Sequence, residues 1–551
     1  MMNFAQNLIE PFRKYNYVTF DLRGEIPEEE EKGFIPFLGG RKKLTIGSIE
    51  KILTSIEGAD AIDGVLVTIS ELRIGLARAN SLRRRFLALR RRGKKVFVYI
   101  ESGGNIEYLL ASSGDYIYIP PWAMLNLIGL GAEVTFFREL LDKLGITALM
   151  KGYGEYKSAA EMFTRDSMSR PHREMIDSIT GDLESQLEEA ISEGRGINSE
   201  SVKSIIDRGP FIPAAAFAEG LIDGTAFEEE IEGKAAEITG VTVKAVTAER
   251  FNRVLRFKDA IGYIIRAVGG GGGKIAVVTD SGIVTSGESM GRGGLKTMGS
   301  ASVLRLLKRL SKDRSIKALI LRISSPGGSG VASDLIRKRL EEISERIPVV
   351  ISMSDVSASG GYLIALGAHK IIADPMSLTG SIGVVSGKFD LEAFYGKLGV
   401  KKELVLLGKK SLMFSSSRGF SEDEEKKLDE LLKYYYGEFV RTVSEERNLS
   451  PGEAEKAAKG RVWTGRQAKA LGLVDGLGGF WEAVDIAARE AGLPQDRPPR
   501  LGFYSSAAGL RISSLFRDTA YLYELTEHLE NVGRACSEVC LAIMPFKINV
   551  K

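Results

Sequence analysis

This chain contains an internal duplication, which limits the folds open to it more than any other feature. The run GVLVTIS at 64–70 recurs as ALILRIS at 318–324, an offset of 254 residues. The same offset relates the KLG run at 143–145 to the one at 397–399. A repeat of this length predicts two tandem domains, each large enough to bury its own core.

Within each half, apolar runs of strand length alternate with helical patterns. This alternation implies right-handed βαβ crossovers, and therefore an α/β fold with mostly parallel sheets and helices on their faces. The repeat continues to GLIDG at 220–224, which returns as GLVDG at 472–476. The predicted strands are 18–20, 65–69, 96–100, 275–278, 319–323 and 349–351, and the predicted helices are 80–92 and 332–346.

Five consecutive glycines, Gly269–Gly273, separate the halves and are typical of a flexible joint. We therefore predict an N-terminal repeat at 1–268, a glycine linker at 269–273 and a C-terminal repeat at 274–495. Residues 496–551 fall outside the duplication, and the sequence assigns them no role.

Composition excludes several classes of protein. The 75 Lys and Arg against 72 Asp and Glu give a net charge of +3, without the basic excess of a dedicated nucleic-acid-binding protein. Two cysteines, Cys536 and Cys540, offer neither a disulfide framework nor a cysteine-rich zinc site. Only three histidines occur, so a histidine-ligated metal or a histidine-based triad has few candidates. We predict no cofactor and no metal.

Membrane contact is predicted to be peripheral at most. Charged residues through the first thirty positions leave no room for a signal-peptide core or an N-terminal anchor. The long uncharged run between Asp115 and Glu133 contains Pro120 and Pro121, so we expect buried strand and loop there. The arginine-rich stretch at 83–95 can contact anionic lipid headgroups, but a solvated helix face is the alternative that we favour.

Two glycine-rich turns follow consecutive predicted strands of the second half. The first is Ser325-Pro326-Gly327-Gly328-Ser329, and a turn of this kind can leave backbone N–H groups uncovered for an oxyanion. The second contains Ser359-Gly360-Gly361, where a serine beside two glycines can act as a nucleophile. Each also has a plain reading, as an ordinary strand-to-helix turn or an N-cap serine. Parallel strands on consecutive βα units bring both turns to one sheet edge.

The duplication supplies an internal control for these turns. At the offset of 254, Pro326-Gly327-Gly328 corresponds to Leu72-Arg73-Ile74, and Ser359-Gly360-Gly361 to Asn105-Ile106-Glu107. If these residues only shaped turns, both copies would need them. Their restriction to one half favours chemistry.

A nucleophilic serine needs a base, and a lysine can serve if burial lowers its pKa. The first half holds Lys157 within GYGEYKSAAEMF at 152–163, and its counterpart in the second half is Ser411. Each half therefore holds one member of a possible Ser/Lys dyad. The plain reading of Lys157 is a surface lysine.

These motifs, in this order, resemble the long form of the signal peptide peptidase A family, also called protease IV. The resemblance rests on SPGGS at 325–329, ASGGY at 358–362, LTGSIGV at 378–384 and GRVWTG at 460–465, together with YKSA at 156–159. It spans residues 15 to 490.

The resemblance implies two ClpP/crotonase-like repeats and a serine endopeptidase that cleaves signal peptides and other membrane-derived apolar peptides. Position by position, Ser359 matches the nucleophile, Lys157 the general base, Gly327 and Gly328 the oxyanion turn, and Ser381 a serine that orients the lysine. It also implies a homo-oligomer, a tetramer in the family, and membrane association, although the family's usual N-terminal anchor is not visible in this sequence.

Two other functions remain open. One is a non-catalytic scaffold of the same fold that binds membrane-derived peptides or partner proteins. The other is a crotonase-type acyl-CoA enzyme, which uses paired N–H groups to hold a thioester oxyanion but needs no serine beside them. The presence of Ser359-Gly360-Gly361 argues against the second.

Overall fold

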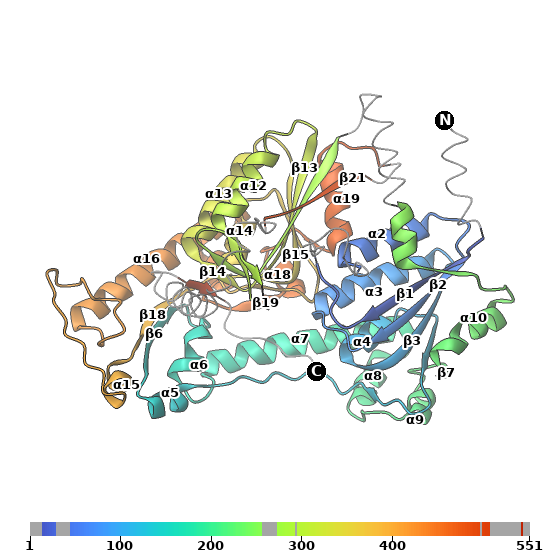
Figure 1. Cartoon of the computed structure of the whole chain (residues 1–551), viewed down its shortest axis with the longest axis horizontal. Helices are drawn as coiled ribbons and strands as arrows, with labels where there is room; N and C mark the ends of the chain where they lie inside the picture. The colour runs from blue at the N-terminus through green and yellow to red at the C-terminus, as the bar shows by residue number, and fades with distance from the viewer. Residues whose placement is uncertain are drawn as a thin grey trace, which may run out of the picture. The chain divides into compact units, whose positions relative to one another are not determined.

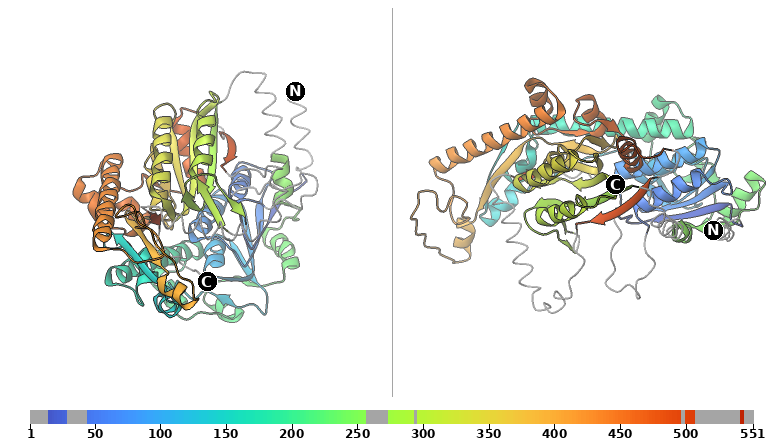
Figure 2. Two further views of the ribbon diagram at one scale, coloured as in Figure 1. Left: turned by 60° about the vertical axis from the view of Figure 1, so that its left-hand side comes forward. Right: turned by 90° about the horizontal axis from the view of Figure 1, so that it is seen from above.

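The computed structural model describes residues 14–28, 44–255, 273–292, 295–495, 499–506 and 541–543 of the 551 (Figures 1 and 2). The chain forms two compact units. Of the described residues, those within 1–131 and 181–272 form unit 1, and those within 132–180 and 273–549 form unit 2. Residues 132–180 belong to the first half of the sequence but to the second compact unit.

Unit 1 is built on a twisted sheet whose order is β7-β4-β3-β2-β1-β8, with β5 pairing with β3. The pairings are parallel, as the alternation of strands and helices predicts. Its central strands bury both faces, because helices cover the sheet. The strands are β1 (Tyr17–Arg23), β2 (Gly64–Ser70), β3 (Lys95–Gly104), β4 (Tyr116–Ile119), β5 (Leu125–Asn126), β7 (Gly224–Thr225) and β8 (Ala245–Thr247), and the helices are α2 (Ile46–Glu57), α3 (Leu76–Arg91), α4 (Asn105–Ala111), α8 (Ser199–Ile206), α9 (Pro213–Ala218), η3 (Glu228–Glu230) and α10 (Ile231–Thr239).

Unit 2 contains a corresponding sheet in the order β19-β17-β15-β13-β9-β21, extended by β16 and β20. Its core strands are parallel, and only β19 joins antiparallel. The strands are β9 (Lys274–Ser281), β13 (Ile316–Ser325), β15 (Val349–Ala358), β16 (Lys370–Ala373), β17 (Leu378–Gly380), β19 (Val462–Thr464), β20 (Gly476–Leu477) and β21 (Arg500–Ser505), and the helices are α12 (Ser300–Leu310), α13 (Gly330–Ser344), α14 (Gly360–Ala365), α16 (Glu422–Arg447), α17 (Pro451–Ala457), α18 (Gly465–Ala470) and α19 (Phe480–Glu490).

A second sheet of unit 2 joins segments that are far apart in the sequence, in the order β11-β12-β10-β14-β22-β18-β6. Its last strand, β6, comes from the first half of the sequence and pairs antiparallel with β18 over seven residues (Figure 1). The segment around β6 also contributes four helices: α5 (Arg138–Leu144), η2 (Ser158–Ala160), α6 (Glu161–Thr164) and the first part of α7 (Arg170–Arg195). The strands are β6 (Thr147–Tyr153), β10 (Ile283–Thr285), β11 (Gly291–Arg292), β12 (Leu295–Gly299), β14 (Gly327–Ser329), β18 (Val384–Asp390) and β22 (Leu541–Ile543), and α15 (Glu392–Lys397) follows β18.

The duplication is visible in the hydrogen bonds of the two repeats. In the second repeat the hydroxyl of Tyr362 donates to Leu473 O at 2.8 Å, and in the first Tyr108 donates to Leu221 O at 2.7 Å. Each repeat also closes with an arginine–aspartate pair at 3.0 Å, whose aspartate accepts the N–H of a strand residue. These trios are Arg447, Asp475 and Ile371, and Arg195, Asp223 and Ile117.

The predicted boundaries of the two repeats, 1–268 and 274–495, stay a prediction. The repeats are defined by sequence similarity, whereas the two compact units are defined by contacts, so the two divisions need not coincide. The glycine linker lies outside the described residues except for Gly273, and Cys536 and Cys540 lie outside them as well. Of the C-terminal residues, β21 and β22 are described.

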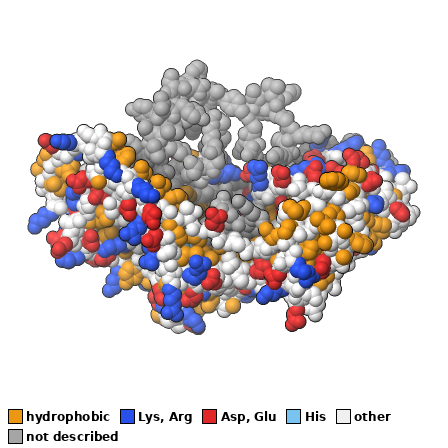
Figure 3. All heavy atoms as spheres, turned by 90° about the horizontal axis from the view of Figure 1, so that it is seen from below, with side chains coloured by type: hydrophobic (Ala, Val, Ile, Leu, Met, Phe, Trp, Pro, Cys, Tyr) orange, Lys and Arg blue, Asp and Glu red, His pale blue; other side chains and the backbone are white. Residues whose placement is uncertain are grey.

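Arginines of α3 pair with acidic residues of unit 1. Arg83 is buried, at 3% exposure, and lies 2.8 Å from Glu193. Arg85 and Arg90 lie 3.1 Å from Glu57 and 3.4 Å from Asp115, respectively. Charges of both signs also alternate over the face seen in Figure 3. Among the described helices, none is long and apolar enough to cross a membrane.

Helix α16 lies along the β6–β18 pair and begins at a buried carboxylate. Glu424 is fully buried, accepts from the Arg418 guanidinium at 2.6 and 2.7 Å, and accepts the Ser421 N–H at 2.9 Å. The Arg418 guanidinium, followed by the Ser421 N–H, lowers the pKa of Glu424 to about 2. Because α16 packs on β6, this capping box supports the strand that leads to Lys157.

We expect Glu424→Gln to lower the free energy of unfolding by about 1–3 kcal/mol at pH 7, because it removes the charge from a buried ion pair. A folded-state pKa below the ordinary value of about 4.3 stabilises the fold above that pH. The difference from wild type should therefore shrink as the pH falls from about 4.3 towards 2. Thermal unfolding across this range measures it, with the exposed Glu422→Gln as the control. A pH-independent difference would contradict the account.

Candidate active site

Ser359 lies at the turn between β15 and α14, at the carboxyl edge of the second repeat's sheet. It is fully buried, and its N–H donates to Gly380 O at 2.7 Å. Its backbone φ is 54°, in the left-handed region that costs a non-glycine residue energy. A sharp strand-to-helix turn of this kind projects the side chain away from both elements.

Lys157 lies four residues after the end of β6 and reaches the same place. Only 4% of the residue is exposed, and its Nζ lies 2.7 Å from Ser359 Oγ. Lys157 Nζ also donates to Ser381 Oγ at 2.9 Å and to Ser381 O at 3.0 Å. All three residues belong to unit 2, so one compact unit contains the whole arrangement.

Glycines allow the backbone around Lys157 to pack this closely. A Cβ on Gly460 would lie 2.5 Å from Lys157 Cβ, and one on Gly152 would lie 2.7 Å from Lys157 O. Gly460 also has φ 77°, where other residues are strained. Any side chain at Gly460 would therefore displace the lysine.

Arg461 links the lysine segment to Ser381. Its carbonyl accepts the Ser381 N–H at 2.7 Å, and its guanidinium lies 4.7 Å from the ring centroid of Tyr156, next to Lys157. The Trp463 ring lies against the same guanidinium at 4.6 Å. The guanidinium also pairs with Glu174 at 2.8 Å and lowers the pKa of that carboxyl.

The Pro-Gly-Gly turn lies beside Ser359. Strand β13 pairs with β15 at Ser325 and Ser357, which brings the two turns side by side. Gly328 could not carry a side chain, because a Cβ there would lie 2.0 Å from Val284 O. The Gly327 N–H donates to Ser325 Oγ at 3.2 Å.

Gly360 is a further possible backbone N–H donor, and the glycine-rich pattern alone does not mark it as one. A Cβ on Gly360 would lie 3.2 Å from Gly328 N, so the backbones of the two turns nearly touch. As the first residue of α14, Gly360 carries one of the N–H groups that a helix leaves without an intrahelical partner. The duplication could have marked Gly360, because the first half has Ile106 at the equivalent position.

The corresponding place in the first repeat is filled by structural hydrogen bonds. Asn105, the counterpart of Ser359, donates to Gly129 O at 2.8 Å and accepts the N–H groups of Ile128 and Gly129 at 3.1 Å. Glu107, which replaces the second glycine, accepts the Leu72 N–H at 2.7 Å. These side chains stabilise the turn that glycines form in the second repeat.

His172 and His369 make contacts outside the Lys157–Ser359 pair. His172 lies 3.0 Å from a Glu161 carboxyl oxygen, and burial lowers its pKa. His369 accepts the Val349 N–H at 3.3 Å. Among the described residues, no group of three or more His, Cys, Asp or Glu side chains is placed to hold a metal ion.

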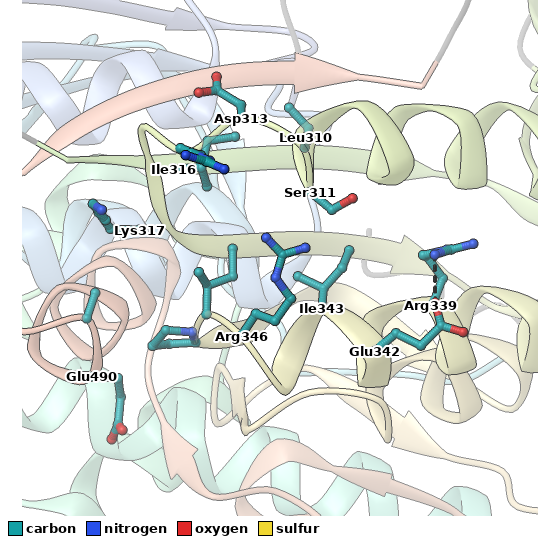
Figure 4. Close-up of a pocket in the computed structure, with 14 residues that line it drawn as sticks. Leu310, Ser311, Asp313, Ile316, Lys317, Arg339, Glu342, Ile343, Arg346 and Glu490 are labelled. Atoms are coloured by element: carbon teal, nitrogen blue, oxygen red, sulfur yellow. Dashed lines mark hydrogen bonds and ion pairs between the residues drawn. The ribbon is translucent and has the colours of Figure 1, made fainter.

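A cavity of about 600 Å³ lies at the opposite end of the same sheet (Figure 4). Its lining includes Ile316, the first residue of β13, and Pro348, just before β15, whereas Ser359 follows the far end of β15. In Figure 4 Arg339 pairs with Glu342 on the cavity wall, at 2.6 Å. This cavity is separate from Lys157 and Ser359.

Comparison with known proteins gives the same family in both halves. Peptidase family S49 matches residues 88–242 and 341–494. The serine protease SPPA of Arabidopsis thaliana chloroplasts is 30% identical over 88% of this chain and 70% of its own length. Protease 4 of Salmonella typhi is 33% identical over 73% of this chain and 65% of its own length, and Protease 4 of Haemophilus influenzae is 31% identical over 73% and 66%.

Among solved structures, a membrane-bound stomatin-specific protease aligns over 42% of this chain and 98% of its own, with 16% identity and a TM-score of 0.27. The S49 matches, one in each half, and the mostly parallel sheets confirm the predicted fold of two tandem α/β repeats. The resemblance to the signal peptide peptidase A family is confirmed by the names and identities of the relatives. The chain belongs to peptidase family S49.

Proposed function

We propose that this chain is a serine endopeptidase in which Ser359 is the nucleophile and Lys157 the general base. The observation that carries the proposal is the contact of 2.7 Å between Lys157 Nζ and Ser359 Oγ at a buried site. A scaffold protein has no need to bury an amine against a serine, and a crotonase-type enzyme needs no serine beside its paired N–H groups. Membership of a peptidase family supports the same reading.

The proposed reaction begins with neutral Lys157. Its Nζ takes the proton of Ser359 as Oγ attacks the scissile carbonyl, and it later gives that proton to the leaving amine. Water then hydrolyses the ester with Lys157 again as the base. Ser381 is a positioning residue in this scheme, since its hydroxyl and carbonyl fix the direction of Nζ.

The oxyanion would be held by backbone N–H groups of the two turns. We propose the N–H of Gly328 together with that of Gly360, because the two turns approach closely at these residues. Gly327 shapes the turn, and its N–H already has Ser325 Oγ as an acceptor.

A peptide substrate would bind as an added strand. Strand β22, near the end of the chain, pairs with β14 at Gly327–Ser329 and with β18 at Val385. A peptide substrate would take the place that β22 fills between β14 and β18, next to the Pro-Gly-Gly turn. We propose that signal peptides and other membrane-derived apolar peptides bind in the same way, at a peripheral membrane location.

We expect Ser359→Ala and Lys157→Ala each to reduce cleavage of a quenched apolar peptide by about 10³-fold or more, because nucleophile and base act as one unit. Fluorophosphonate labelling of Ser359 should be lost with Ser359→Ala and slowed with Lys157→Ala. Ser357→Ala is the matched control, a buried serine two residues away whose hydroxyl donates to Gly361 O. If Ser357→Ala abolished cleavage and Ser359→Ala did not, the nucleophile would be misassigned.

Activity should rise with pH through neutral to mildly alkaline values as a single deprotonation. A free lysine has a pKa of about 10.4, and burial disfavours the ammonium form, which lowers it. Arginine cannot become neutral in this range, so Lys157→Arg should be as inactive as Lys157→Ala. A pH–rate profile of both proteins tests this. Turnover by Lys157→Arg, or activity falling across the alkaline range, would mean that another group takes the proton.

Ser381→Ala should reduce kcat by about 10- to 100-fold with little change in KM, because the lysine keeps one acceptor at this residue, the carbonyl. The pH–rate profile should also shift, which a purely structural role would not cause. Ser377→Ala is the control, a buried serine whose hydroxyl bonds to Ser354 O. Equal effects of the two substitutions would remove the positioning role.

A further inference from the structure

The cavity of Figure 4 carries more positive charge than its own acidic residues balance. Asp313 already pairs with Lys274 at 2.8 Å, and Glu342 pairs with Arg339 at 2.6 Å. The carboxylate of Glu490 points away from the labelled basic groups in Figure 4. Three further basic residues line the cavity and form no ion pair in the part of the chain that the structure describes. They are Arg314, Lys317 and Arg346.

The duplication shows how the first repeat fills the equivalent place. Helices α12 and α13 and strand β15 begin 254 residues after α2, α3 and β3. In the first repeat, Glu57 at the end of α2 lies 3.1 Å from Arg85 and 3.4 Å from Arg92. Lys94 Nζ donates to two backbone carbonyls of the same corner, at 2.8 and 2.6 Å. One carboxylate and one ammonium group therefore occupy this place in the first repeat.

The second repeat has neither of these side chains. At the offset of 254, Ser311 stands at the position of the glutamate and Pro348 at that of the lysine. The two arginines are kept, as Arg339 and Arg346. All four residues line the cavity of about 600 Å³. The second repeat thus keeps the guanidinium groups and leaves open the place of the carboxylate between them.

Apolar side chains line another part of the same cavity. Leu310, Ile316 and Ile343 are 3–4% exposed, and Ile347 and Ala491 lie beside them in the lining. Arginine holds a carboxylate through two parallel hydrogen bonds, and an apolar wall favours a hydrocarbon chain. The cavity therefore suits a molecule that carries a carboxylate on an apolar stem.

We propose that this cavity binds such an amphiphilic carboxylate, and that its charged group takes the place that Glu57 occupies in the first repeat. Arg346 is the principal donor, because Arg339 already has Glu342 as a partner. The two other basic residues add to the positive field, and the stem lies against Ile316 and the other apolar residues of the lining.

Two sources supply this chemistry. One is a fatty acid, and the other is the C-terminal carboxylate of a short apolar peptide. The peptide source rests on the proposed function, because cleavage of an apolar peptide releases such a carboxylate. The site itself does not, since it is argued from the cavity and its counterpart in the first repeat.

Helix ends offer a simpler account of the basic residues. Both α12 and α13 end at this cavity, and the partial negative charge of a helix C-terminus attracts cations. The first repeat argues against this as the whole explanation. Helices α2 and α3 end in the same way, and Glu57 still lies between their arginines. A carboxylate is therefore compatible with this pair of helix ends.

Isothermal titration calorimetry with octanoate tests the site. We expect one octanoate to bind per chain, and the uncharged octanamide to bind about 10-fold more weakly or not at all. Arg346→Gln should weaken octanoate binding by about 10-fold or more, because it removes a charged donor. Arg309→Gln is the matched control, at an exposed arginine of α12 outside the cavity lining. No binding to wild type, or equal effects of the two substitutions, would overturn the proposal.

Ser311→Glu tests whether the ligand takes the place of the glutamate. This change restores the residue of the first repeat, so its carboxylate should occupy the arginines and abolish octanoate binding. Ser311→Gln has the same size without the charge and should weaken binding by a smaller factor. Equal losses in the two variants would overturn the assignment of the charged group to this place.

A peptide acid separates the two sources. N-acetyl-leucyl-leucine and its C-terminal amide are titrated into the Ser359→Ala variant, which cannot cleave them in the proposed mechanism. If the acid binds at least as tightly as octanoate, and its binding is lost with Arg346→Gln, the site takes peptide C-termini. Weaker binding of the acid assigns the site to fatty acids, and failure of both acids overturns it. A wild type that cleaves no peptide would refute the proposed function and leave the octanoate result unchanged.

Discussion

The contact between Lys157 and Ser359 depends on the pairing of β6 with β18. A lysine amine can be buried only where its hydrogen bonds are satisfied, because an unpaired polar group away from water costs several kcal/mol. Here Ser359 and Ser381 supply acceptors from two strand ends of the second repeat. The lysine reaches them because β6 leaves the first half of the sequence and joins a sheet of unit 2.

Duplication allowed each half to specialise. Both repeats keep the framework, seen in the tyrosine and arginine–aspartate bonds that recur at equivalent positions. The turns have diverged. The first repeat fills its sheet edge with Asn105 and Glu107, whereas the second keeps glycines and small hydroxyl side chains there. The proposed dyad thus needs both halves of the sequence, although it lies in one compact unit.

The sequence alone predicts much of this arrangement. Parallel strands joined by helices put the turns after β13 and β15 at one edge, and the complementary losses between the halves mark Ser359 and Lys157. The sequence does not predict the contacts that depend on close backbone packing. Gly360 and Gly460 matter because other atoms lie 2.5 to 3.2 Å from where their Cβ would be, and no periodicity encodes such distances. The grouping of residues 132–180 with the second unit is likewise a property of long-range pairing.

The protonation state of Lys157 tests the central claim most directly. In protein labelled with ¹³C at lysine Cε, NMR spectra recorded across neutral and alkaline pH would follow each lysine separately. We expect one resonance, absent from Lys157→Ala, that titrates well below the ordinary value of about 10.4. If every lysine titrated near that value, Lys157 would remain an ammonium at neutral pH and could not take the serine proton.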